Sequence, residues 1–170
     1  VLVKDTLQAL QDLGAAARNR SAAKFIAVTG SVGKTSTKEA LKTVLSAQAR
    51  TFASEGNLNN HWGAPLSLAR MPRDTEIGIF ELGMNHANEI RPLAKMVRPH
   101  AAIITTVEAV HIEFFSSVAE IADAKAEILE GLEPGGTAIL PRDNAHFARM
   151  AARAKALGVA HIVGFGADAL

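Results

Sequence analysis

Two hydrophobic patterns alternate along the chain, one typical of buried strands and the other of helices. Short apolar runs, which fit buried strands, occur at residues 24–29, 50–54, 76–82, 101–107, 136–140 and 161–166. Apolar residues at helical spacing occur in the segments 5–20, 34–49, 65–71, 87–97, 117–132 and 144–158. Pro92 falls in the first turn of one such helix, where proline is tolerated. The pattern therefore predicts helices between successive strands.

This alternation predicts an α/β domain with a largely parallel sheet that is flanked by helices on both faces. A chain of 170 residues is long enough for one such domain. Within the helix predicted at 34–49, we expect one face to pack on the sheet, formed by Ala40, Leu41, Val44 and Leu45. We divide the chain into a leading helix and linker, residues 1–23, and the domain proper, residues 24–170.

Composition and charge exclude several classes of protein. The 18 Lys and Arg residues nearly balance the 17 Asp and Glu residues, so no basic surface for nucleic acid is expected. Cysteine is absent, which excludes disulfides, thiolate metal sites and cysteine nucleophiles. The apolar runs are too short to span a bilayer, and the N-terminal segment lacks the layout of a signal peptide. We therefore expect a cytoplasmic protein, and a monomer.

The segment "VTGSVGKTSTKE" is similar to a phosphate-binding loop. The usual pattern G-x-x-x-x-G-K-[ST] has a glycine where this chain has Val28, but Gly30 and Gly33 remain, and a predicted strand and helix flank them. Glycines allow backbone N–H groups to turn toward an anion at the start of a helix. Lys34 can reach the β- and γ-phosphates, and the Thr35 hydroxyl can ligate Mg²⁺. This placement favours a P-loop NTPase-like site over the alternative, a plain strand-to-helix turn.

Two charged residues occupy unusual positions. Glu81 lies near the end of the apolar strand predicted at 76–82. A carboxylate there is costly unless a partner such as Mg²⁺ binds it. The alternative is a strand-terminal acid exposed to water. Lys125 projects from the apolar face of the helix predicted at 117–132. That spacing also fits a lysine whose stem covers apolar surface while its ammonium reaches water.

Two loops carry further candidates. His111 follows the strand 101–107 and could ligate a metal or position a phosphate, although by itself it fits an ordinary polar loop residue better. The segment "NLNNHWGAP" places Asn59, Asn60 and His61 before a predicted helix. Such side chains can recognise phosphate, sugar or peptide groups, and they are equally common in turns.

Together, "TGSVGKTSTKE", "NLNNHWGAPLSL", "ELGMNHANEI", "VHIEFFSS" and "DAKAEI" resemble the central ATP-binding domain of the Mur ligases of peptidoglycan synthesis. These motifs occur in the order of that family across most of the chain from Lys24 onward. The second and third are most similar to the members that join D-alanyl-D-alanine to UDP-MurNAc-tripeptide. Asn88 stands where those members have a glycine.

The resemblance implies that the chain binds ATP and Mg²⁺. The nucleotide-binding residues that it implies are Gly30, Ser31, Val32, Gly33, Lys34, Thr35 and Ser36. The metal ligands that it implies are Thr35 and Glu81 for the Mg²⁺ on ATP, His111 for a second Mg²⁺, and Lys125 after carbamylation by CO₂. Carbamylation requires a neutral amine, and an apolar setting lowers the pKa of a lysine in that direction.

The reaction implied by the resemblance is an ADP-forming ligation with Lys34, His111 and Lys125 as catalytic residues. The γ-phosphoryl group of ATP passes to the carboxylate of UDP-MurNAc-tripeptide, and the amine of D-alanyl-D-alanine then displaces phosphate. Asn59, Asn60 and His61 are implied to face these substrates. Mur ligases have three domains and only the central one matches, so we expect this chain alone to be inactive as a ligase.

Three other functions remain open at this stage. The first is a sibling Mur ligase or a folylpolyglutamate synthase, because these enzymes share the ATP loop. The second is a P-loop kinase; a GTPase is disfavoured because the chain contains no N-K-x-D segment. The third is a non-catalytic module that keeps the fold.

Overall fold

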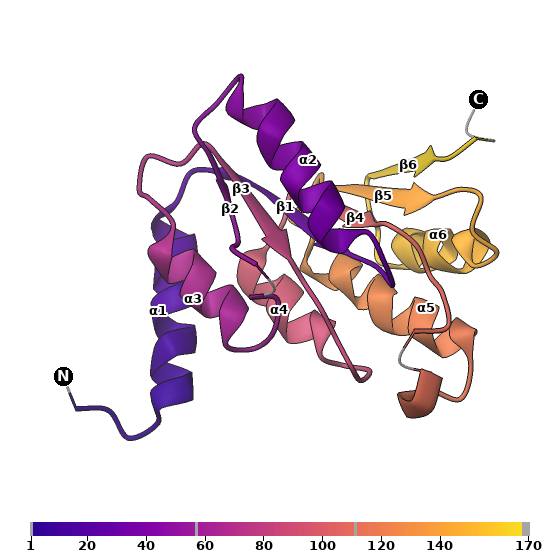
Figure 1. The fold of residues 1–170 in the computed structure, drawn as a ribbon, viewed down its shortest axis with the longest axis horizontal. Coiled ribbons are helices and arrows are strands. Elements are labelled where there is room, and N and C mark those ends of the chain that lie inside the picture. The colour runs from indigo at the N-terminus through magenta and orange to yellow at the C-terminus, as the bar shows by residue number, and fades with distance from the viewer. Residues whose placement is uncertain (1, 57, 111, 168–170) are drawn as a thin grey trace.

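The computed structural model describes residues 2–56, 58–110 and 112–167 and contains a six-stranded sheet (Figure 1). The strands are β1 (Lys24–Thr29), β2 (Thr51–Ala53), β3 (Ile77–Glu81), β4 (Ala101–Ile104), β5 (Thr137–Pro141) and β6 (His161–Phe165). The α-helices are α1 (Thr6–Arg20), α2 (Lys34–Ser46), α3 (Gly63–Arg70), α4 (Ile90–Val97), α5 (Val118–Ala126) and α6 (Phe147–Ala156). Two short 3₁₀ helices are η1 (Ile112–Phe114) and η2 (Glu127–Gly131).

The strands pair in the order β2-β3-β1-β4-β5-β6, and every pair is parallel. This arrangement confirms the predicted α/β fold. In the register of the sheet, Val28 of β1 pairs with Glu81 of β3, and Thr29 pairs with Ile104 of β4. The carboxyl ends of these three strands therefore lie side by side.

Helices cover both faces of the sheet, as predicted, but unequally. The face under α2 has a small core of Val28, Ala53, Ile79 and Ile103, against which Leu41 and Leu45 of α2 pack. The other face packs against α1, α3, α4, α5 and α6, and Figure 1 shows α2 in front of the sheet with α4 and α5 behind it.

The expectation that Ala40 and Val44 pack on the sheet is wrong. Both are exposed, and 60% of Val44 is accessible to solvent. The buried stripe of α2 is narrower than predicted and runs through Lys38, Leu41 and Leu45. The elements that α2 contacts most are strands of the sheet, β1, β2 and β3, so its apolar contact is confined to one line of residues.

Several elements are shorter than predicted, among them the strand at 101–107 and the helix at 117–132. The strand predicted at 101–107 ends at Ile104, although the next residues still bond to the end of β1 and the turn after it: the N–H of Thr105 donates to Thr29 O (2.9 Å), and Thr106 O accepts from the N–H of Ser31 (2.9 Å). The helix predicted at 117–132 is divided into α5 and η2. Glu127, where the division falls, directs its carboxylate at backbone N–H groups near the start of α4.

No helix within residues 2–56, 58–110 and 112–167 is both long enough and apolar enough to cross a membrane.

The connections from the sheet diverge beside β1. The helix that follows β1 is α2, on one face, whereas α4 and α5, which follow β3 and β4, lie on the opposite face. Adjacent strands whose connections leave in opposite directions open a crevice at their carboxyl ends, which is where α/β proteins bind ligands. The predicted phosphate loop lies at this point.

Candidate active site

The phosphate loop, residues 30–35, is the turn from β1 into α2. Gly30 and Gly33 have positive φ angles of 150° and 82°, which glycine adopts with little strain. A Cβ atom on Gly30 would collide with the side chain of Thr105. Both glycines are therefore required by the backbone, and the loop brings main-chain N–H groups to the N-terminus of α2.

The segment after β4 holds the loop in this shape. The Thr105 hydroxyl donates to Val32 O (2.6 Å), and the Ser31 hydroxyl both donates to Glu108 O (3.1 Å) and accepts from the Glu108 N–H (2.8 Å). Ser31 is buried, with 8% of its surface exposed. Its hydroxyl is thus committed to supporting the loop rather than to reacting with a substrate.

Lys34 lies over the loop that precedes it. Its Nζ donates to Gly30 O (2.8 Å) and is 3.3 Å from Ser31 O. Burial lowers the pKa of Lys34 below its usual value, and the nearby charge of Glu81 partly offsets this effect. The ammonium is therefore held close to the loop amides by bonds that a phosphate oxygen could replace.

Behind the loop, Glu81 connects two predicted site residues. The Thr35 hydroxyl donates to Glu81 Oε2 (2.8 Å), and the Asn59 amide donates to Glu81 Oε1 (2.8 Å). Glu81 is only 2% exposed, whereas Thr35 is open to solvent. The alternative of a water-exposed strand-terminal acid is therefore wrong.

These oxygen donors fit Mg²⁺ bound together with a nucleotide. Mg²⁺ prefers hard oxygen ligands and usually takes one or two from the protein, with the remainder supplied by water and phosphates. The hydroxyl of Thr35 and the carboxylate of Glu81 meet this description beside the loop. Among the described residues, no three His, Asp or Glu side chains form a metal-binding cluster, so this part of the chain holds no all-protein metal cage.

Lys125 of α5 is buried, with 3% of its surface exposed. Its position on the apolar face is as predicted, and its side chain is almost wholly enclosed. Burial, followed by the charge of Lys34, lowers the pKa of Lys125 to about 8.

The three predicted substrate residues have different surroundings. Asn59 is bonded to Glu81, as described above. The side-chain oxygen of Asn60 accepts from the N–H groups of Trp62 (3.1 Å) and Gly63 (2.9 Å), a turn role at the start of α3. His61 is exposed and borders a hollow of about 290 Å³ between its own loop and the segment 83–93. His111 lies outside the described residues.

Asn88, which also borders that hollow, has φ 69°. Asparagine tolerates this left-handed conformation better than most residues, so it can replace the glycine expected there. The buried Glu127 carboxylate accepts from the N–H groups of Asn88 (2.7 Å) and Arg91 (3.0 Å). Asparagine at this position is thus compatible with the left-handed backbone conformation.

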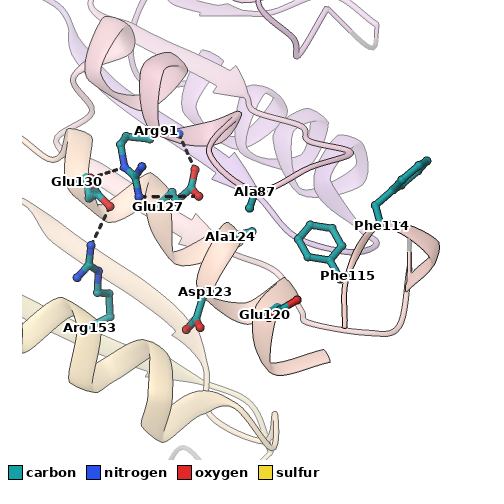
Figure 2. Close-up of a pocket in the computed structure, with 10 residues that line it drawn as sticks. All are labelled: Ala87, Arg91, Phe114, Phe115, Glu120, Asp123, Ala124, Glu127, Glu130 and Arg153. Carbon is teal, nitrogen blue, oxygen red and sulfur yellow. Dashed lines mark hydrogen bonds and ion pairs between the residues drawn. The ribbon is translucent and has the colours of Figure 1, made fainter. Parts of the chain in front are cut away.

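A separate cavity of about 500 Å³ lies between the segment before α4, η1, α5 and α6 (Figure 2). Three of its charged groups pair across it: Arg91 Nε is 2.7 Å from Glu130 Oε2, and Arg153 is 2.9 Å from the other oxygen of Glu130. None of the residues that line it belongs to the phosphate loop. This cavity is therefore separate from the loop that the sequence predicts to bind phosphate.

Comparisons with known proteins agree with the geometry. The family model described as "Mur ligase middle domain" matches residues 28–170. The chain belongs to the Mur ligase middle domain family. It is 45% identical over 166 residues to the UDP-N-acetylmuramoyl-tripeptide--D-alanyl-D-alanine ligase of Rickettsia prowazekii (strain Madrid E), a match that covers 98% of this chain and 37% of that protein.

Solved Mur ligases have the same fold. A crystal structure of MurF from Acinetobacter baumannii superimposes with a TM-score of 0.91 at 39% identity, covering 99% of this chain and 37% of that one. MurF of Thermotoga maritima, solved in complex with ADP, gives a TM-score of 0.87 at 27% identity, covering 99% and 38%. The chain thus spans less than half the length of these Mur ligases.

One buried group in this Mur ligase middle domain was not predicted from the sequence. Lys38 of α2 is completely buried, and its Nζ donates to Ser54 O (2.6 Å). The residues one turn away are mostly polar, a pattern typical of an exposed lysine. The usable signal was its spacing from Leu41 and Leu45, which places it in the stripe that faces the sheet.

Proposed function

We propose that this chain is the ATP-binding part of an ADP-forming ligase that joins D-alanyl-D-alanine to UDP-MurNAc-tripeptide in the cytoplasm. The observation that carries the proposal is the contact between Thr35 and Glu81 directly behind the phosphate loop (2.8 Å). The 45% identity to a UDP-N-acetylmuramoyl-tripeptide--D-alanyl-D-alanine ligase supports the choice of substrates. In this proposal residues 24–170 form the central domain, residues 1–23 precede it, and the protein is a monomer.

The chain's own residues would act mainly by positioning and by neutralising charge. The loop amides and Lys34 would hold the β- and γ-phosphates, and Thr35 and Glu81 would hold Mg²⁺, which supplies further neutralisation of the phosphate charge. The γ-phosphoryl group moves to the substrate carboxylate, the bond to ADP breaks, and an acyl phosphate forms. The amine of D-alanyl-D-alanine then attacks the acyl carbon, loses a proton, and releases phosphate.

The substrate residues follow from the same geometry. Asn59 is fixed by Glu81, so its segment lies beside the position proposed for the γ-phosphate. His61 and Asn60 line the adjoining hollow of about 290 Å³. We propose that the peptide end of UDP-MurNAc-tripeptide approaches the phosphate through this hollow. A second metal held by His111 remains part of the proposal.

The role of Glu81 can be tested by separating ATP binding from its dependence on metal. Glu81→Gln should leave the affinity for ATP in EDTA almost unchanged, because the loop amides and Lys34 are intact. The gain in affinity on adding Mg²⁺ should fall about tenfold, since the charged metal ligand is lost. Calorimetric titration with and without Mg²⁺ measures both quantities.

The control for this experiment is Glu76→Gln. Glu76 is an exposed carboxylate just before β3, at the opposite end of the same strand. This variant should retain the full effect of Mg²⁺. An undiminished effect of Mg²⁺ in Glu81→Gln would show that Glu81 does not ligate the metal.

Carbamylation of Lys125 should depend on pH in a defined direction. The neutral amine combines with CO₂ to give a carbamate and a proton, so the reaction requires the unprotonated form. With a pKa of about 8 rather than 10.5, Lys125 has roughly 300 times more neutral amine at pH 7 than an ordinary lysine. A carbamate signal from ¹³C-bicarbonate, followed by NMR, should therefore increase between pH 6.5 and 8.5.

Substitution identifies the source of that signal. Lys125→Ala should abolish it, and Lys95→Ala, which removes an exposed lysine of α4, should leave it unchanged. A signal that survives in Lys125→Ala, or that is absent at pH 8.5 with saturating bicarbonate, would contradict the assignment.

A further inference from the structure

Lys38 is the most unusual charged residue outside the proposed chemistry. It lies on α2, one turn after Thr35, and 0% of its surface is exposed. Burial of an ammonium group is costly unless its hydrogen bonds are satisfied within the protein. Lysine is not needed to fill the space, since an apolar side chain of similar length would avoid that cost.

Lys38 has two hydrogen-bond acceptors and one ion-pair partner within the protein. Its Nζ donates to Ser54 O (2.6 Å) and Gly56 O (3.1 Å), and it lies 3.2 Å from Glu39 Oε1. Two of these partners are backbone carbonyls of the segment that follows β2. Lys38 therefore fastens α2 to the polypeptide that leads toward Asn59.

The same segment also contacts Glu81. The Ser54 hydroxyl accepts from the Glu81 N–H (3.1 Å), and the Ser54 N–H donates to Ile79 O (2.9 Å). Further along, Asn59 bonds to the Glu81 carboxylate through its side chain, and its carbonyl accepts from the Gly83 N–H (2.8 Å). The segment is thus attached to the end of β3 at several points.

These contacts form a closed ring that includes both proposed metal ligands, Thr35 and Glu81. The ring runs from Lys38 to Ser54, from Ser54 to Glu81, and from the Glu81 carboxylate to Thr35, which returns to α2. Thr35 and Lys38 are three residues apart and share one side of the helix. The distance between the Thr35 hydroxyl and the Glu81 carboxylate is therefore set partly by Lys38.

We propose that Lys38 is a positioning residue that, through Ser54 and Gly56, holds the Glu81 carboxylate and Asn59 in place opposite Thr35. The inference rests on the proposed function, because it assigns to Lys38 the alignment of groups that bind Mg·ATP. Lys38 itself touches neither nucleotide nor metal; its effect is transmitted through the backbone of residues 54–56.

Lys38→Met tests this role because it keeps the length of the side chain and removes its donors. Affinity for ATP in EDTA should stay within about twofold of the parent, whereas the gain on adding Mg²⁺ should fall about tenfold. A purely structural lysine would lower the melting temperature without changing this gain. Lys42→Met, which alters an exposed lysine one turn further along α2, should leave both quantities unchanged.

A second variant covers the case in which Lys38→Met does not fold. Ser54→Ala removes the hydroxyl that accepts from the Glu81 N–H but keeps the carbonyl that accepts from Lys38. It should reduce the gain from Mg²⁺ in the same way. Full retention of the gain in either folded variant would overturn the inference and leave the proposed function intact.

Amide hydrogen exchange tests the positioning role of Lys38 separately from the proposed function. In Lys38→Met, or in Ser54→Ala if only that variant folds, exchange should accelerate at Glu81 and Gly83 while the amides of β4 stay protected. This measurement requires no ligand. If the parent failed to bind Mg·ATP, the proposed function would be wrong, and unchanged exchange at these two amides would separately refute the positioning role.

Discussion

Replacing Lys34 with alanine should weaken the binding of ATP roughly 100-fold, which corresponds to about 2.7 kcal/mol. The side chain already lies over the phosphate loop, with its Nζ 2.8 Å from Gly30 O. A phosphate that enters the loop would exchange this carbonyl for a charge-assisted hydrogen bond, which contributes about 1.5–3 kcal/mol. Calorimetric titration of the variant with Mg·ATP measures the loss.

The effect should depend on the number of phosphates in the nucleotide. Since Lys34 is proposed to contact the β- and γ-phosphates, ADP and ATP should both lose affinity, whereas the affinity for AMP should hardly change. Lys24→Ala is the matched control, because Lys24 is an exposed lysine at the opposite end of β1. Equal affinity of the parent and Lys34→Ala for Mg·ATP would refute the assignment of the loop.

The sequence predicts the loop well because the relevant information is local. An apolar strand, two glycines and a lysine at the start of a helix follow one another within a few residues, so no knowledge of the sheet is needed. The pairing of Glu81 with Val28 is different, because it depends on the strand order β2-β3-β1-β4-β5-β6. The sequence predicts that Glu81 lies at the carboxyl edge, but not that it lies one strand away from the loop.

The two buried lysines also differ in how far their burial can be predicted from nearby residues in the sequence. Lys125 has apolar residues one turn away in both directions, so the sequence indicates its unusual position before the structure is known. Lys38 is buried by residues 54–56, which are distant in the sequence and pair with it through backbone carbonyls. Carbonyl oxygens occur at every residue, so a pattern of side chains carries no sign of such a partner.

Gly30→Ala should disrupt the site more completely than any change of a polar side chain. The added Cβ would collide with Thr105, whose N–H donates to Thr29 O (2.9 Å) and whose hydroxyl donates to Val32 O (2.6 Å). Because Thr105 is held at both points, the loop would have to move instead. The expected cost is about 2–3 kcal/mol in the free energy of unfolding, from overpacking together with a backbone angle that alanine rarely adopts.

Gly135→Ala is a control that separates the cost of the collision from the cost of the positive φ angle. Gly135 also has a positive φ, 79°, but a Cβ atom there would meet nothing within 4 Å. This control should cost about 1 kcal/mol and leave the affinity for Mg·ATP unchanged. Urea denaturation and nucleotide titration of both variants make the comparison.

A second substitution, at the neighbouring Thr105, should restore part of the stability and affinity that Gly30→Ala removes. Thr105→Ala removes the oxygen that the new methyl group would overlap, although the Thr105 Cβ would still lie 3.1 Å from it. The double variant should therefore recover part of the stability and part of the affinity for Mg·ATP. If Gly30→Ala alone bound Mg·ATP as tightly as the parent, the loop would not require its glycine. Val28 stands where the usual motif has its first glycine, and Gly30 is the glycine that the backbone is expected to need instead. That result would show that the loop needs neither.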